Sequence, residues 1–578
     1  MHSPGVFALT DLDWILVAGY LLVTLAWGAW HARRAGSSTE EFFAAGRGLP
    51  WWLAGTSMVA TTFAVDTPLA IAGLVATEGI AGNWFWWADV LPAMLGAFLI
   101  AHLWRRSGVL TDNELIELRY GGRSAAGLRL FRALYFGVLR NAIVIGWVNL
   151  AMLKVLQLAL GLDPATGSWV LAGLFALTLS YTLLSGLWGV VLTDVLQFTL
   201  AMVGSILLAV LAVGAAGGLG SLIEQLGLVH GTRAASRTLA LVPPEREAFW
   251  AFVIYVAVKG WSSGNTDGSG YIAQRLLATR DERHARLAAI WYAVANFVLR
   301  PWPWILVGLF AFVVHPGLED PEAGYVRVML DQLPNGLRGL MVASLLAAYM
   351  STIDTQLNWG ASYLTHDVYR RFLRPGASEL ALMRVARASV VLLAALGALA
   401  TLAMPSISGA WKFLASISAG TGLIVLLRWL WWRINAWSEI GVMAASLLLA
   451  NGLFLFTDIP FPFSLALVVA ISVPFALALT WLTSPEEPAC LRAFYERVRP
   501  AGWWGPVAAT LGEKGQPLGV WPWVEVACAT LGVYALLLGT GGLLLGRPAF
   551  GWSGLSLGLA TLLVGVLAGS GRPRPVAT

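Results

Sequence analysis

Residues 345–358, LLAAYMSTIDTQLN, place the oxygen-bearing side chains of Ser351, Asp354 and Thr355 at positions i, i+3 and i+4. On an α-helix this spacing puts the three side chains on one face. Hydroxyl and carboxylate oxygens are hard ligands, and without cysteine or histidine they suit an alkali cation. The alternative is that the hydroxyls bond back to carbonyls of their own helix. Four polar residues within 351–355 favour the cation.

A second polar stretch, MVATTFAVDTPLA at 58–70, interrupts an otherwise apolar membrane helix. An aspartate at the membrane centre costs about 2.5–3.5 kcal/mol on insertion scales, so we expect Asp66 to face a cavity and a partner. Pro68 removes a backbone donor and strains the turn before it. The freed carbonyls can then bind a cation. The alternative is structural, with Asp66 capping a broken half-helix or pairing with an arginine.

A third stretch, VKGWSSGNTDGSGY, interrupts the apolar segment 246–273 with four glycines and Asp267. This segment follows the interrupted segment 50–76 by five membrane spans, so the two cross the membrane in opposite directions. Interrupted segments at matching positions of two halves indicate the binding site of a transporter built from inverted repeats.

These stretches must be positioned by membrane helices. Of 578 residues, 58% are hydrophobic and 12% charged, and the mean hydropathy is +0.72. Soluble domains carry about 25% charged residues, so the composition predicts an all-α polytopic membrane protein. The two cysteines and seven histidines show no spacing typical of a disulfide framework or a metal site.

Apolar windows of about 20 residues, the length that crosses a bilayer, predict about fifteen membrane helices. They lie near 12–30, 50–76, 82–104, 126–160, 168–185, 188–215, 246–273, 287–313, 336–365, 382–403, 409–430, 436–456, 461–483, 520–545 and 550–569.

The basic residues indicate orientation rather than nucleic-acid binding, although the net charge is +5. Alternate connections between the spans carry 26 of the 37 lysines and arginines. Because basic residues concentrate on the cytoplasmic side, this bias predicts an N-terminus outside and a C-terminus in the cytoplasm, in the plasma membrane.

Several segments in one order resemble the sodium:solute symporter family, which includes sodium/proline, sodium/galactose and sodium/sialic acid symporters. They cover about residues 40–375 and read GRGLPWWLAGTSMVATTFA, LTDNELIELRYGGR, YTLLSGLWGVVLTDVLQ, YIAQRLLATR, and LLAAYMSTIDTQLN followed by LTHDVYRR. The C-terminal spans match only in hydropathy.

The resemblance implies a leucine-transporter-type fold with two inverted five-helix repeats. We therefore expect an extra helix and first cytoplasmic loop at 1–48, a ten-helix core at 49–433 and four additional helices at 434–578. Within the core, repeat one covers about 49–215 and repeat two about 246–433.

The resemblance also implies a sodium site. Its ligands are the backbone carbonyls of Ala60, Phe63 and Ala348 and the hydroxyls of Ser351 and Thr352.

A second sodium site, present in some family members, maps onto Asp194, Ser351, Asp354 and Thr355. Asp354 stands where the family often has a hydroxyl. A second sodium ion and a proton carried by one carboxylate therefore both stay open.

The resemblance places the substrate among the broken core helices, where this chain differs from the sugar and proline members by carrying acids. The candidate substrate-binding residues are Asp66, Thr67, Trp86, Asp89, Trp261, Asp267 and Tyr271, with Trp261 and Tyr271 flanking the second break as gates. Three acids beside tryptophans suit an amine or quaternary ammonium. The alternative is that Lys259 or Arg300 neutralises the acids, which leaves a neutral polar substrate.

The sequence thus predicts a sodium-coupled symporter that imports a small polar solute by alternating access, with a cationic solute as the first expectation. A neutral sugar, amino acid or carboxylate is the alternative, as is a transporter-like sensor or a channel. The expected partners are sodium, the solute and the lipid bilayer, without nucleic acid, and the oligomeric state is left open. The sequence shows no nucleophile paired with a base, so we do not expect an enzyme.

Overall fold

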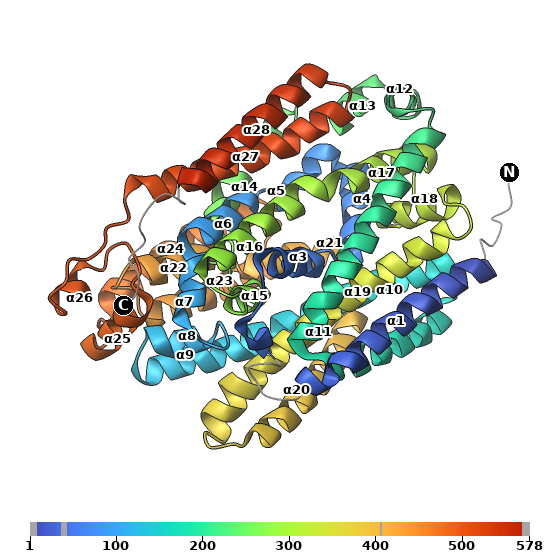
Figure 1. Cartoon of the computed structure of the whole chain (residues 1–578). Helices are drawn as coiled ribbons and strands as arrows, with labels where there is room; N and C mark the ends of the chain where they lie inside the picture. The colour runs from blue at the N-terminus through green and yellow to red at the C-terminus, as the bar shows by residue number, and fades with distance from the viewer. Residues whose placement is uncertain (1–8, 36–42, 405–406, 569–578) are drawn as a thin grey trace. The chain divides into compact units, whose positions relative to one another are not determined.

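The computed structural model describes residues 9–35, 43–404 and 407–568, and its regular structure there is helical (Figure 1). Ten helical segments of the described chain are long and apolar enough to cross a membrane, or up to twelve if each bent pair counts as one span. The other three of the fifteen predicted spans lie in α1 (Asp11–Ala35), the first part of α11 (Pro164–Ala215) and α14 (Arg246–Ser262). The chain is therefore polytopic and all-helical, as the sequence predicts.

The chain forms two compact units, each assembled from three stretches. The first comprises Met1–Asn83, Leu130–Pro244 and Arg300–Trp411, and the second comprises Trp84–Arg129, Glu245–Leu299 and Lys412–Thr578. The division expected at residues 48 and 433 follows the sequence repeats and stays a prediction.

The helices of the first unit are α1, α3 (Trp51–Thr62), α4 (Asp66–Glu78), α10 (Asn141–Leu160), α11, α12 (Leu219–His230), α13 (Thr232–Thr238), α17 (Pro301–Val314), α18 (Gly324–Gln332), α19 (Leu337–Ser362) and α20 (Glu379–Leu402). Those of the second unit are α5 (Trp84–Trp87), α6 (Val90–Leu95), α7 (Ala101–Ser107), α8 (Glu114–Arg119), α14, α15 (Tyr271–Leu277), α16 (Glu282–Val294), α22 (Thr421–Leu430), α23 (Ala436–Phe456), α24 (Phe463–Leu482), α25 (Pro488–Val498), α26 (Gly505–Ala509), α27 (Val520–Leu544) and α28 (Pro548–Ala568). Two of the boundaries between the stretches fall within α9 (Gly122–Leu134) and α21 (Ile407–Ile417). Short 3₁₀ or π-helical turns lie at Ala45–Arg47, Ile80–Asn83, Gly96–Ile100, Tyr135–Arg140, Ala295–Leu299, Pro321–Ala323 and Tyr363–Leu373.

Both predicted helix breaks are confirmed. α3 ends at Thr62 and α4 begins at Asp66, with a bend of 57° between their axes. α14 ends at Ser262, and α15 begins at Tyr271 after a loop with two left-handed glycines. Positive φ is readily adopted only by glycine, so the glycines in this loop permit the path that the chain takes.

One bend was not predicted, and one boundary prediction is wrong. The segment 409–430, predicted as one span, is bent by 44° between α21 and α22, where Gly420 has φ of +83° and a Cβ would collide with the Ser472 hydroxyl. The segments 168–185 and 188–215, predicted as separate helices, are joined in α11. The connecting sequence has no proline, so nothing removes a helical hydrogen bond there.

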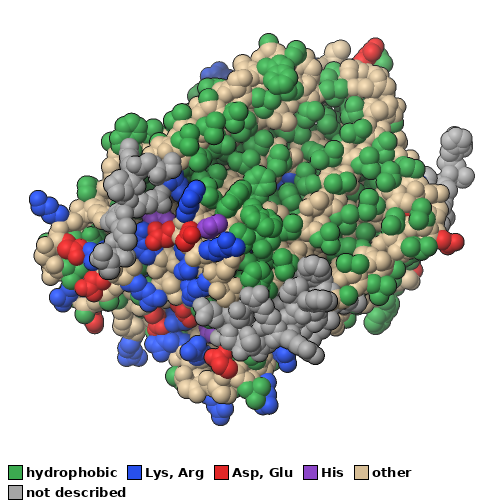
Figure 2. Space-filling model, viewed as in Figure 1, with side chains coloured by type: hydrophobic (Ala, Val, Ile, Leu, Met, Phe, Trp, Pro, Cys, Tyr) green, Lys and Arg blue, Asp and Glu red, His purple; other side chains and the backbone are tan. Residues whose placement is uncertain are grey.

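Exposed apolar side chains mark the surface that faces lipid. α27 and α28 pack side by side (Figure 1), and only 17% of the apolar window of α28 is buried. Its exposed residues include Leu557, Leu559 and Leu563. Figure 2 shows hydrophobic side chains over much of the face in view. Such exposure is expected where the solvent is hydrocarbon.

α19 is the most deeply buried of the candidate spans, with 94% of its window buried. Its N-terminus is held by Asp13 of α1, whose Oδ1 accepts hydrogen bonds from the amides of Gly336 (2.7 Å) and Gly339 (2.6 Å). The first amides of a helix have no partner within the helix, so Asp13 supplies one. The helix before the predicted core thereby fixes the start of α19.

Replacing Asp13 with alanine should lower the free energy of unfolding by about 1–3 kcal/mol, because two buried amides lose their acceptor. Chemical denaturation of the purified chain in detergent measures this. Asp11→Ala removes an exposed carboxylate from the same turn and should change stability by no more than about 0.5 kcal/mol. Equal stability of the two variants would contradict the role of Asp13.

Candidate functional site

The polar face predicted on α19 is present and buried. Ser351, Thr352, Asp354 and Thr355 are each no more than 2% exposed. α19 packs against α3 and α11 within the first unit. The face therefore points into a protein interior, where its oxygens need partners.

Asp194 of α11 joins this face to the broken helix. Its two carboxylate oxygens accept hydrogen bonds from the hydroxyl of Ser57 on α3 and the hydroxyl of Ser351 on α19, each at 2.5 Å. Sequence reasoning paired Asp194 with Ser351 but missed Ser57. The signal for Ser57 is its position one turn before Thr61, on the face of α3 that meets α19.

Four threonines complete the cluster. Thr61 and Thr355 approach through their hydroxyl oxygens at 3.2 Å. The Thr352 hydroxyl lies 3.1 Å from the carbonyl of Thr61 and 3.2 Å from that of Ala348. Thr182 of α11, which the sequence did not suggest, donates to Asp354. The cluster therefore links α3, α11 and α19 through oxygen atoms.

The break between α3 and α4 exposes carbonyls only in part. The carbonyls of Val59 and Ala60 both lie 3.0 Å from the amide of Phe63. A carbonyl has two lone pairs, so Ala60 keeps acceptor capacity. The carbonyl that contacts α19 is that of Thr61. The assignments of the Ala60 and Phe63 carbonyls, with that of Ala348, stay predictions.

The donor set fits an alkali cation. Asp354 is fully buried, and its Oδ2 has no hydrogen-bond partner. Among the described residues, none forms an ion pair with Asp354. A buried carboxylate without a countercharge is unfavourable, and the surrounding hydroxyl, carboxylate and carbonyl oxygens are hard ligands. A bound cation would supply the missing charge.

Asp66 and Thr67 lie at the start of α4. Asp66 is 2% exposed, accepts a hydrogen bond from Trp411 and has an Oδ1 without a hydrogen-bond partner. Arg300 acts on it electrostatically and donates to the Thr62 hydroxyl at 2.9 Å. Thr67 donates to the carbonyl of Thr62 at 3.3 Å. The carboxylate of Glu322 opposes the charge of Asp66 more strongly than Arg300 favours it, so neutralisation of Asp66 by Arg300 stays a prediction.

The other two acids, in the second unit, have basic partners there. Asp89 lies 3.5 Å from the ammonium of Lys259. Asp267 forms a buried ion pair with Arg428 at 2.5 Å. Sequence reasoning suggested Lys259 as a neutralising residue but missed Arg428. These pairs weaken the expectation of a cationic substrate.

The aromatic candidates also belong to the second unit. Trp86 stacks on Phe297, with ring centroids 6.0 Å apart. Trp261 lies in the last turn of α14 and Tyr271 opens α15, so the two flank the break, and both are partly exposed. Their roles as gates stay predictions.

Comparison with known proteins identifies a family. The sequence profile described as "Sodium:solute symporter family" matches residues 42–448. The chain is 26% identical over 430 residues to "Sodium/glucose cotransporter 4" of Danio rerio, covering 68% of this chain and 63% of that protein. It is 28% identical over 439 residues to "Sodium/mannose cotransporter SLC5A10" of Bos taurus, covering 68% and 69%.

Among solved structures, a Na+-coupled sialic acid symporter in a substrate-bound outward-open state matches with a TM-score of 0.70. The sequence identity is 21%, and the match covers 83% of this chain and 99% of that chain. This structural likeness confirms the leucine-transporter-type fold expected from the sequence.

Replacing Thr182 with valine should lower the free energy of unfolding in Na+-free buffer by about 1.5–3 kcal/mol, because the Asp354 carboxylate loses its donor. Adding Asp354→Leu should recover most of that loss, since the buried charge is then gone as well. Chemical denaturation in detergent measures both variants. A double variant as unstable as Thr182→Val would contradict the contact.

Proposed function

This chain belongs to the sodium:solute symporter family, and we propose that it couples the inward movement of Na+ to the uptake of a small neutral, hydroxyl-bearing solute. It is a multi-pass membrane protein of a transporter family, not an enzyme. The proposed orientation places the N-terminus outside and the C-terminus in the cytoplasm of the plasma membrane.

The observation that carries the proposal is the oxygen cluster at the first helix break. It joins α3, α11 and α19 and holds the buried carboxylate of Asp354, whose Oδ2 has no hydrogen-bond partner. We assign one Na+ to the carbonyls of Ala60, Phe63 and Ala348 with the hydroxyls of Ser351 and Thr352. The second cation is assigned to Asp194, Asp354 and Thr355 with Ser351.

Binding at this cluster favours the conformation in which α3 and α19 are close together. A ligand shifts a conformational equilibrium only by its differential affinity for the two states. Because α3 ends at the break, fixing it against α19 also fixes the start of α4, where Asp66 and Thr67 lie. The membrane potential adds about 2.3 kcal/mol per charge for each 100 mV.

Three observations support a neutral solute. Asp267 and Asp89 are paired with Arg428 and Lys259, so their charges are already balanced. Asp66 has one oxygen without a hydrogen-bond partner among the described residues, which suits the hydroxyl group of a solute. The relatives named above are described as glucose and mannose cotransporters.

The solute-binding residues proposed from sequence keep this role as part of the proposal, with altered chemistry. In the first unit Asp66 and Thr67 supply hydrogen bonds. For Trp86, Trp261 and Tyr271 of the second unit, solute binding stays a prediction from the sequence, as it does for Asp89 and Asp267, which have basic partners.

Changing Ser351 and Thr352 together to alanine should raise the Na+ concentration that gives half-maximal thermal stabilisation by at least about tenfold, since two ligands are lost. Thermal unfolding of the purified chain is measured from Na+-free buffer upward, with KCl keeping the ionic strength constant. The matched control, Ser344→Ala, lies on the same helix and removes a hydroxyl bonded to the carbonyls of Leu340 and Leu200. Equal shifts in the two variants would contradict the ion assignment.

An inward Na+ gradient should accumulate D-glucose in proteoliposomes above its outside concentration, whereas a channel would only equilibrate it. Asp66→Asn should keep the KM for D-glucose within about tenfold, because the amide oxygen still accepts a hydroxyl. Choline, as a competing organic cation, should not inhibit uptake. Competition by choline that disappears in Asp66→Asn would restore the cationic solute and contradict the neutral one.

A further inference from the structure

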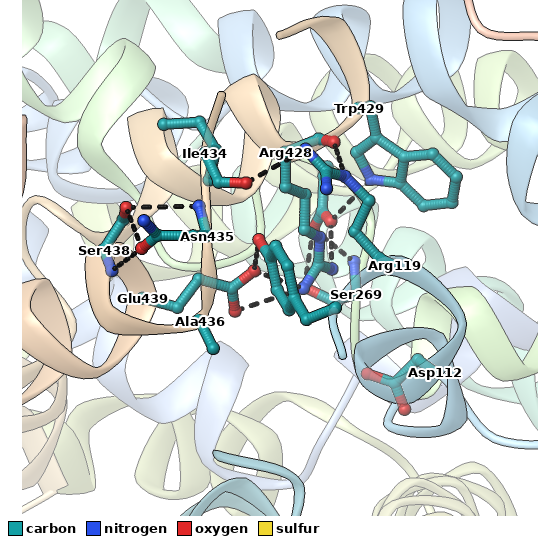
Figure 3. Close-up of polar contacts among 12 residues, drawn as sticks. Asp112, Arg119, Ser269, Arg428, Trp429, Ile434, Asn435, Ala436, Ser438 and Glu439 are labelled. Atoms are coloured by element: carbon teal, nitrogen blue, oxygen red, sulfur yellow. Dashed lines mark hydrogen bonds and ion pairs between the residues drawn. The ribbon is translucent and has the colours of Figure 1, made fainter. Parts of the chain in front are cut away.

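A buried cluster of charges in the second unit holds the end of one helix against the loop between two others (Figure 3). Arg428, near the end of α22, contacts Asp267 at 2.5 Å and Glu439 at 3.3 Å. The side chains of all three are no more than 1% exposed. Glu439 also accepts a hydrogen bond from Tyr120 at 2.7 Å. We call these four residues the Arg428 cluster.

Asp267 transmits this contact to the backbone of the loop 263–270. Its Oδ1 accepts hydrogen bonds from the amide (3.1 Å) and hydroxyl (2.6 Å) of Ser269, while its Oδ2 also accepts one from the Trp429 indole at 3.1 Å. The backbone carbonyl of Asp267 accepts a hydrogen bond from Trp104 at 2.6 Å. The carboxylate of Asp267 therefore orients the loop and also pairs with the guanidinium of Arg428 on α22.

The two ends of the loop are held by the bend before α22 and by the chain before α8. The amide of Gly420 donates to the carbonyl of Ser262 at 3.1 Å. The amide of Gly270 donates to Asp112 at 2.9 Å. Because Gly268 and Gly270 have positive φ, the loop itself has few intrinsic restraints. Contacts with neighbouring helices must define its conformation.

Arg119 holds the main chain at the end of α22, which carries Arg428. Its guanidinium donates to the carbonyls of Arg428, Trp431, Trp432 and Ile434 at 2.8–3.1 Å. These are carbonyls at and beyond the end of α22, where a helix leaves acceptors unsatisfied. Arg119 thus fixes the main chain from which Arg428 projects.

We infer that Arg428 is a positioning residue for transport, which holds the loop between α14 and α15 in one conformation by bridging Asp267 and Glu439. An arginine suits this role because its planar fork donates to two carboxylates at once, whereas a lysine presents a point charge. Removing it takes the ion-pair partner from the buried carboxylate of Asp267, and the loop must then move to let water reach Asp267. The inference rests on the proposed function only where it concerns solute uptake.

Hydrogen–deuterium exchange of the full chain in detergent tests the conformational part. In Arg428→Met, the amides of Ser269 and Gly270 should exchange at least about tenfold faster than in wild type. Adding Asp267→Asn removes the uncompensated charge and should restore exchange to within about threefold. Arg433→Met, which removes a partly exposed arginine of the following turn, should leave exchange at 263–270 unchanged.

Uptake into proteoliposomes tests the role in transport, with D-glucose driven by a Na+ gradient as the probe. Arg428→Met should lower the maximal rate at least about tenfold, Arg428→Lys should restore part of it, and the half-saturating Na+ concentration should stay within about twofold. Unchanged exchange at the loop in Arg428→Met, or faster exchange with normal uptake, would overturn the inference. If the wild-type protein transports no D-glucose, the proposed solute is wrong. The exchange measurement alone then tests whether Arg428 positions the loop.

Discussion

A backbone group that loses its helical partner inside a membrane must find another partner, because hydrocarbon supplies none. The broken helices meet this constraint with groups distant in sequence. Thr352 contacts the carbonyl of Thr61, Trp104 donates to the carbonyl of Asp267, and the amide of Gly420 donates to the carbonyl of Ser262. Each break is therefore also a point of contact with another helix. A shift of one helix can be passed on to its neighbour there.

The two types of buried acid explain how one protein can use carboxylates differently. Asp267 has Arg428 beside it, so its charge is balanced within the fold and serves to hold a loop. Asp354 has a threonine donor, and none of the described residues forms an ion pair with it, so a bound cation would complete its site as we propose. A buried charge that is not paired is unstable. Under the proposed function this instability makes the site of Asp354 sensitive to Na+, whereas the paired Asp267 is suited to positioning.

The sequence predicted the breaks because proline, glycine and intramembrane aspartates act locally, as at Pro68 and Asp267. It also predicted the polar face of α19, since helical spacing fixes which side chains share a face. It could not identify Arg428, Ser57 or Thr182, whose partners lie 161, 137 and 172 residues away. Pairing over such separations depends on how helices pack. The bend at Gly420 was missed although its glycine was visible, because one glycine within an apolar run is often tolerated.

The central claim is that oxygens at the first break, with those of α19, bind Na+. Equilibrium binding of ²²Na+ to the purified chain, with KCl at constant ionic strength, tests it most directly. We predict saturable binding that K+ does not displace, and its loss when Ser351 and Thr352 are both alanine while Ser344→Ala still binds. Absence of saturable ²²Na+ binding to a folded wild-type chain, or unchanged binding by the double variant, would contradict the account.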